Sequence, residues 1–164
     1  MLRFIHILVY FVLLNVVMHA QQNKVVTDKS TKVFYIGEDE KEYEKLVKNY
    51  NTLLFTVCEN KMDKAYDIWS LLLKDIEDFS TKQNYDLKGV KIWLNVFWDK
   101  DGTIDFIVFY PKPNSKNVNY DQLKTILASF GKSYHSTLKY TSSFSHYGSA
   151  SFPLLSKSIT GTER

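Results

Sequence analysis

Two stretches of alternating apolar residues, joined by a short acidic turn, constrain the fold of this chain more than any other feature. Because successive side chains of a strand point to opposite sides, a set of alternating apolar residues is expected on one face. The turn Asp99–Gly102 ends in a glycine, which tolerates the positive φ that tight hairpin turns require. The sequence therefore predicts an antiparallel β-hairpin over 90–110, with two even-numbered apolar sets: Val90, Ile92, Leu94, Val96 and Trp98, then Ile104, Phe106, Val108 and Tyr110.

Helical spacing of apolar residues predicts two helices before this hairpin. The first covers Asp39–Cys58, with acidic residues at its start, where the helix dipole favours negative charge. The second and more regular one covers Asn60–Gln83, with Asn60 as the expected N-cap. Leu53–Val57 is also compatible with a strand by composition, so the end of the first helix stays open.

After the hairpin, the sequence predicts one more helix and a last strand. Apolar residues recur every three or four positions over Tyr120–Tyr134, with Gly131 as the expected stop, and alternation returns over 144–155. The predicted fold class is α+β. A small antiparallel sheet, made of the hairpin 90–110 and the strand near 144–155, packs against two or three helices in the order α-α-β-β-α-β.

The first twenty residues have the layout of a secretory signal peptide. Arg3 provides the basic start, an apolar run extends from Phe4 to Met18, and Ala20 is a small residue at the expected cleavage point. The run is shorter than the roughly 20 apolar residues of a spanning helix, although an uncleaved anchor is the alternative. We expect export to the periplasm or the extracellular space. The expected divisions are 1–20 (signal peptide), 21–36 (N-terminal tail or short strand), 37–157 (one α+β domain) and 158–164 (flexible tail).

Charge and cysteine content exclude several classes of protein. The chain of 164 residues carries 21 Lys+Arg against 18 Asp+Glu, and these charges are interspersed. Nucleic-acid binding usually shows clustered basic residues, so it is not expected. Cys58 is the one cysteine and forms no internal disulfide. No transmembrane segment is expected after signal cleavage.

The sequence contains no constellation typical of catalysis or metal binding. Cys58 could form a nucleophile pair with His135 or His146, but it ends an apolar helical stripe and is expected to be buried. The histidines lack a second spaced ligand for zinc, and Asp99–Gly102 lacks the further acids of a calcium loop. We therefore expect no catalytic residue, cofactor or metal. An exported hydrolase using Cys58 or His146 is the least favoured alternative.

Aromatic residues suggest the candidate binding surface. Trp93, Phe97, Ile107 and Phe109 occupy odd positions in the hairpin, opposite the even apolar sets. Either helices or tails cover this second face, or the face exposes an aromatic patch to a partner or ligand. The candidate partner- or ligand-binding residues are Trp93, Phe97, Trp98, Phe109 and His146.

The region from Lys88 to about Lys157 resembles the C-terminal domain of TonB-type proteins. The shared features are the strand and acidic turn in Asn95–Ile104, the helix start at Asp121-Gln122-Leu123 and the last strand at Ala150–Leu154. TonB transducers also have a membrane anchor and a long proline-rich spacer, where this chain has two predicted helices. The resemblance implies the fold and the binding of another protein by strand addition at a sheet edge.

Two functional hypotheses follow. The first is an exported, non-catalytic protein–protein interaction module of the cell envelope, of TonB C-terminal-like type, with an envelope protein as its partner. The alternative is a periplasmic carrier or sensor of a small ligand. Its aromatic-lined cavity would lie between the helices and the hairpin, near Trp93 and Trp98.

Overall fold

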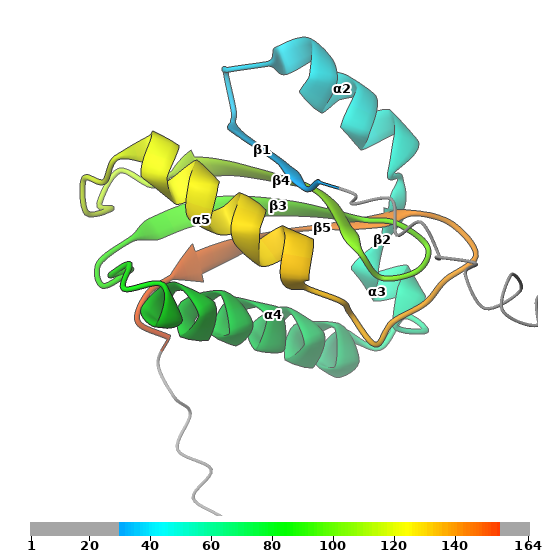
Figure 1. Ribbon diagram of the computed structural model, residues 1–164. Helices are drawn as coiled ribbons and strands as arrows, with labels where there is room; N and C mark the ends of the chain where they lie inside the picture. The colour runs from blue at the N-terminus through cyan, green and yellow to red at the C-terminus, as the bar shows by residue number, and fades with distance from the viewer. Residues whose placement is uncertain (1–29, 155–164) are drawn as a thin grey trace, which may run out of the picture.

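The computed structural model describes residues 30–154, which form four helices and one five-stranded sheet (Figure 1). The predicted signal peptide 1–20, residues 21–29 of the predicted tail, and the tail 158–164 lie outside the described residues. The elements are β1 (Lys32–Tyr35), α2 (Glu40–Asn49), β2 (Thr52–Leu53), α3 (Leu54–Val57), α4 (Met62–Lys82), β3 (Lys91–Trp98), β4 (Ile104–Pro111), α5 (Tyr120–Ser133) and β5 (Phe144–Ser151).

The predicted hairpin is confirmed as β3 and β4, and the fold class is α+β. Gly102 has a φ of +86° and donates its N–H to the Asp99 carbonyl at 3.0 Å, which closes the turn. β5 pairs antiparallel with the other side of β3, as the alternation over 144–155 suggested. This places β3 at the centre of the sheet.

The sheet is mixed, so the prediction of a purely antiparallel sheet in the order α-α-β-β-α-β is wrong. The strand order is β1-β4-β3-β5-β2, and the two outer strands, β1 and β2, run parallel to their neighbours. Both are short and come before the hairpin in sequence. Their partners lie more than seventy residues further along the chain, for example Phe106 for Lys32, so local periodicity could not reveal them.

The single helix predicted over Asp39–Cys58 is instead divided into α2, β2 and α3. Asp39 caps α2, because its side chain accepts a hydrogen bond from the Glu42 N–H at 3.0 Å. After α2 ends, Thr52 and Leu53 pair with Phe144 and Ser145 of β5. Pairing with β5 therefore overrides the helical spacing at this point.

A β-bulge changes which side chains of the hairpin share a face. The register runs from Phe97 opposite Phe106 to Trp98 opposite Ile104, so Asp105 is an extra residue in β4. An extra residue reverses the alternation beyond it. Ile107 and Phe109 therefore lie on the same face as the even residues of β3, and the prediction that they lie on the opposite face is wrong.

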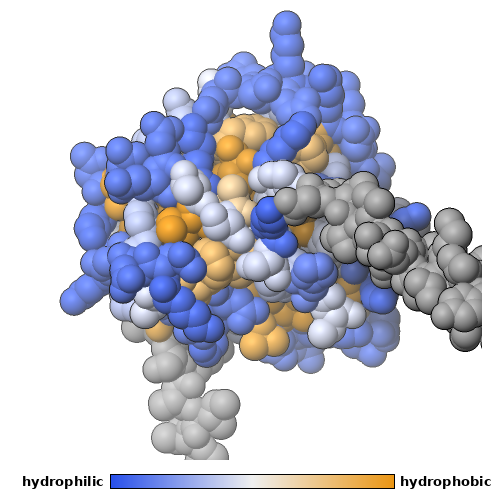
Figure 2. Space-filling view, viewed as in Figure 1, coloured by the Kyte–Doolittle hydropathy of each residue, from blue (hydrophilic) through white to orange (hydrophobic). Residues whose placement is uncertain are grey.

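Helices cover the two faces of the sheet unequally. α4 and α5 pack over one face and bury the main core with side chains such as Leu72, Ile76 and Leu127 (Figure 1). α2 covers part of the other face, where Leu46 packs on Phe34, Phe97 and Val108. From the side seen in Figure 2, hydrophilic residues form the periphery and hydrophobic residues show in patches nearer the centre.

Two predicted helix boundaries are also corrected. Asn60 is not the N-cap of α4: it has a φ of +58°, and the helix begins after Lys61. Gly131 does not stop α5, which continues to Ser133. A Cβ at Gly131 would lie 2.5 Å from the Thr31 side chain. The glycine therefore lets the chain before β1 cross close to the helix.

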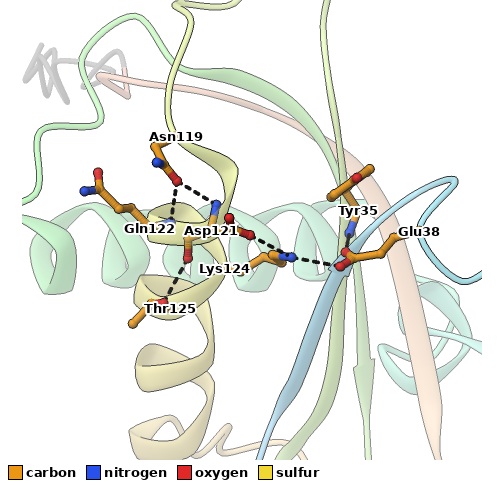
Figure 3. A network of polar contacts seen from close by, with 7 residues as sticks. All are labelled: Tyr35, Glu38, Asn119, Asp121, Gln122, Lys124 and Thr125. Atoms are coloured by element: carbon orange, nitrogen blue, oxygen red, sulfur yellow. Dashed lines mark hydrogen bonds and ion pairs between the residues drawn. The ribbon is translucent and has the colours of Figure 1, made fainter.

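Polar contacts fix the start of α5 against the β1–α2 connection (Figure 3). The Asn119 side chain accepts hydrogen bonds from the N–H groups of Asp121 and Gln122 at 2.9 and 3.1 Å. Lys124 bridges Glu38 and Asp121 at 2.8 and 3.0 Å. These contacts satisfy free N–H groups of the helix start and join segments that are far apart in sequence.

Candidate interaction site

The structure separates the five predicted binding residues rather than bringing them together. Trp93 is 37% exposed on the sheet face that carries α2. His146 is half-buried on the opposite face, with its ring centroid 4.6 Å from that of Trp69 in α4. The other three, Phe97, Trp98 and Phe109, are buried.

Phe97, Trp98 and Phe109 are core residues, so their assignment to a binding surface is corrected. Phe97 lies in the cluster beneath α2 and makes an edge contact with Tyr50. Trp98 stacks on Phe144 with ring centroids 5.2 Å apart, and Phe109 packs in the main core. The bulge explains why Phe109 is buried in the main core, because it turns that side chain toward α4 and α5 rather than toward the face of Trp93.

The exposed part of the second face carries an aromatic patch, defined here as Trp93, Tyr110 and Tyr147. Tyr110 is 49% and Tyr147 is 55% exposed. The Trp93 and Tyr147 rings stack, with centroids 5.5 Å apart and an interplanar angle of 22°. Both alternatives for this face are thus partly met, because α2 covers one part of it and leaves the aromatic patch accessible.

Lys112 lies across this aromatic patch. Its ammonium is 4.1 Å from the centroid of the Trp93 ring and donates a hydrogen bond to the Ser149 hydroxyl. The side chain therefore extends from the end of β4, over β3, to β5. A cation over an indole face is electrostatically favourable, so the two contacts hold this ammonium in a defined place.

The outer edge of β5 exposes backbone hydrogen-bonding groups. Phe152 N–H bonds the Val90 carbonyl at 2.9 Å, whereas the Lys91 carbonyl accepts from Lys112 on the other side of β3. Because antiparallel pairs alternate, every second residue of β5, including Gly148 and Ala150, directs its N–H and C=O toward β3.

The intervening residues Tyr147, Ser149 and Ser151 direct these groups away from β3. β2 occupies this edge at Phe144 and Ser145 alone. The outward N–H and C=O groups of Tyr147, Ser149 and Ser151 form no hydrogen bond with any residue between Ser30 and Leu154. The edge therefore offers three consecutive ladder positions.

An apolar groove of about 830 Å³ follows the same edge, between β5 and α4 (β5 orange-red, α4 green in Figure 1). Its lining includes Trp69, Ser70 and Leu73 of α4 and Phe152 after β5. A Cβ at Gly148 would lie 2.6 Å from the Trp69 ring, so this glycine allows the indole to rest on the strand backbone. The groove and the open backbone thus form one continuous site.

In the part of the chain that the structure describes, no hydrogen bond joins Cys58 to His135 or His146. Cys58 is fully buried, and burial raises the pKa of its thiol, which disfavours the nucleophilic thiolate. Burial lowers the pKa of His146 and so favours the neutral ring. His135 lies just after α5, with Nδ1 3.3 Å from the Ser133 carbonyl.

A smaller cleft of about 280 Å³ lies where the C-terminal halves of α4 and α5 meet. Burial, together with the charge of Asp78, raises the pKa of the Asp75 carboxyl there. Burial also raises the pKa of the Tyr134 hydroxyl. His135 lines the cleft too, but no hydrogen bond in the described structure joins it to Asp75. Three or more metal-ligating side chains gather nowhere in residues 30–154.

Most residues of this candidate site could not be predicted from the sequence. Tyr147, Ser149 and Lys112 were not singled out, although the alternation of serines in 145–151 is a signal of one strand face. That β5 has an open edge depends on the strand order, which is a property of the whole sheet.

Within the described range, no helix has both the length and the apolar character needed to cross a bilayer.

Comparisons of the chain with protein-family models, with curated proteins and with solved structures find no match.

Proposed function

We propose that this protein is a non-catalytic interaction module that binds an extended segment of another protein as an additional strand beside β5. The observation that carries the proposal is the outward backbone of Tyr147, Ser149 and Ser151 directly beside the apolar groove. An added strand would pair with the three residues. Its alternate side chains would enter the groove against α4.

The energetics require both parts of this site. A backbone hydrogen bond contributes about 0.5–1.5 kcal/mol net, and association itself costs at least about 4 kcal/mol. The open ladder alone would therefore bind weakly. Burying one Leu- or Val-sized side chain adds about 1.5–3 kcal/mol, so side chains in the groove raise the affinity while the ladder fixes the register.

Two features of the sequence support a cellular setting for this proposed function. The signal-peptide layout of residues 1–20 supports export to the periplasm or beyond. The resemblance of 88–157 to TonB C-terminal domains supports strand addition as the binding mode. The partner would then be a protein of the cell envelope or the extracellular space.

Selection of peptides from a random library, displayed on phage and presented to the full chain, tests the proposal. We expect enrichment of extended sequences with alternating apolar residues. The variant Ser149→Pro removes an outward N–H while leaving the bonds to β3 in place, so it should abolish binding.

A matched pair of variants tests the groove. Ser70→Arg places a long side chain in the groove, whereas Leu71→Arg adds the same side chain at an exposed position of α4 outside the groove lining. Binding should be lost in Ser70→Arg and retained in Leu71→Arg. Recovery of no peptide, or equal binding by these two variants, would refute strand addition at β5.

The groove also supports a second function, as a carrier or sensor of a small apolar ligand. Its volume of about 830 Å³ is within the range typical of small-molecule sites. It lies between β5 and α4 and contains Trp69, rather than near Trp98 as the sequence suggested. Native mass spectrometry of the purified full chain would detect a retained ligand, and Trp69 fluorescence should then change on its removal. A ligand-free spectrum combined with peptide binding excludes this alternative.

A further inference from the structure

Lys112, which follows β4, reaches the outer edge of β5. Its ammonium bonds the Ser149 hydroxyl and covers the Trp93 ring. Ser149 is one of the three residues whose backbone faces outward. A positive charge is therefore fixed beside the middle position of the open ladder.

Among residues 30–154, no acidic side chain forms an ion pair with Lys112; the acids Asp67 and Glu77 line the groove on the α4 side of the edge. None of the ion pairs in that part of the chain includes Lys112 or Lys91, which lie next to each other at the ends of β4 and β3. The neighbours on the same face, Trp93, Tyr147 and Ser149, are uncharged. On this face of the sheet, a carboxylate brought to the position beside Ser149 would thus meet the Lys112 ammonium.

Strand geometry places one side chain of an added strand at that position. A residue directly opposite Ser149 would share its face, with its Cβ about 4.5–5.5 Å from that of Ser149. An Asp or Glu carboxylate there is within reach of the Lys112 ammonium. The residues on either side of it point to the other face, into the groove beside Trp69 and Leu73.

We propose that the β5 edge selects an extended protein segment with an apolar–acidic–apolar triplet, in which the acidic side chain pairs with Lys112 opposite Ser149. This inference rests on the proposed function and specifies its partner. Lys112 acts as the specificity-determining residue. The aromatic patch excludes water from one side of the ion pair, which strengthens it relative to an exposed pair.

Peptides selected on phage with the full chain provide the probes for the test. We expect an acidic residue at one fixed position between two apolar ones. Replacing it by the corresponding amide should weaken binding to the full chain about tenfold, as loss of a partly desolvated ion pair does. The affinity of the acidic peptide should also decrease with added salt.

Variants of Lys112 then assign the effect to this residue. Lys112→Met keeps an apolar stem over Trp93 and removes the charge, so it should weaken the acidic peptide about tenfold and leave the amide peptide unchanged. Lys112→Glu should prefer a peptide with Lys at the same position. Lys100→Glu, in the hairpin turn at the other end of β3, makes the same change in net charge and should have no effect.

The outcomes separate the two proposals. If peptides bind and Ser149→Pro abolishes binding, but Lys112→Met binds acidic and amide peptides as the unmodified chain does, the acidic preference is wrong while strand addition stands. If the library yields no peptide, both proposals fail.

Discussion

Single side chains with a defined partner decide where the elements of this protein begin and how they meet. Asn119 caps α5, and Lys124 joins that helix start to Glu38 (Figure 3). Asn95, buried in β3, donates to the Tyr43 hydroxyl of α2 at 2.7 Å. A buried polar group is costly without such a partner, so these bonds fix how α2 and α5 attach to the sheet.

The cap of α5 gives a prediction at this scale. Asn119→Ala should lower the free energy of unfolding by about 0.5–2 kcal/mol, because two N–H groups of the first turn lose their acceptor. Chemical denaturation of the full chain measures the change. Asn117→Ala, in the same loop and exposed, is the control and should leave stability unchanged. An equal loss in both variants would contradict the cap.

His146 gives a pH dependence. Burial against Trp69 lowers its pKa in the folded state below the ordinary value of 6.5. The unfolded chain therefore takes up the proton first as pH falls, and stability should decrease below pH 6.5 until the folded-state pKa is passed.

Unfolding free energies measured from pH 7.5 down through this window should show the decrease in the unmodified chain. His146→Gln should reduce it, while His135→Gln, on an exposed residue, should not. If the unfolding free energy fell equally with pH in the unmodified chain and in His146→Gln, another group would be responsible for the pH dependence.

At the scale of elements, the residues of β5 alternate between those whose backbone groups bond β3 and those whose backbone groups point outward from the sheet. Ala150 gives its N–H to β3, and Ser149 directs its N–H outward. Side-chain burial follows the same division, because Ala150 is buried and Ser149 is exposed. One edge of β5 is thus paired with β3, and the other edge has backbone groups free to pair with a further strand.

Proline substitution tests this division. Ala150→Pro should destabilise the fold by at least about 1–3 kcal/mol, since it removes a donor and leaves a buried carbonyl of β3 without its bond. Ser149→Pro should cost less than about 1 kcal/mol, because an outward N–H in an edge strand has no partner to lose. Thermal and chemical denaturation compare the two. Equal destabilisation would mean that the register of β5 is different.

At the scale of the whole molecule, the order β1-β4-β3-β5-β2 places the hairpin in the interior of the sheet and an incompletely paired edge beside α4. α4 and α5 bury one face, and α2 covers part of the other. The site is the part of the sheet that neither β2 nor the helices close.

Amide hydrogen exchange measures this arrangement across the chain. We expect the slowest exchange in β3, which is paired on both sides, and faster exchange at Tyr147, Ser149 and Ser151 than at Gly148 and Ala150. Binding of a selected peptide should slow the three outward amides in particular. Protection of all five amides before any peptide is added would show that the edge is already closed.

Local sequence pattern determined the hairpin, the helices α4 and α5, the strand β5 and the α+β class, because periodicity and turn chemistry act between neighbouring residues. The bulge at Asp105, the parallel pairing of β1 and β2, and the open edge beside Ser149 were decided by the tertiary structure. Each depends on backbone pairing between distant segments, and one inserted residue reverses a whole strand face. For that reason Trp93 was recognisable from the sequence as a candidate binding residue, whereas Lys112 and Ser149 came together only when β4, β3 and β5 were aligned.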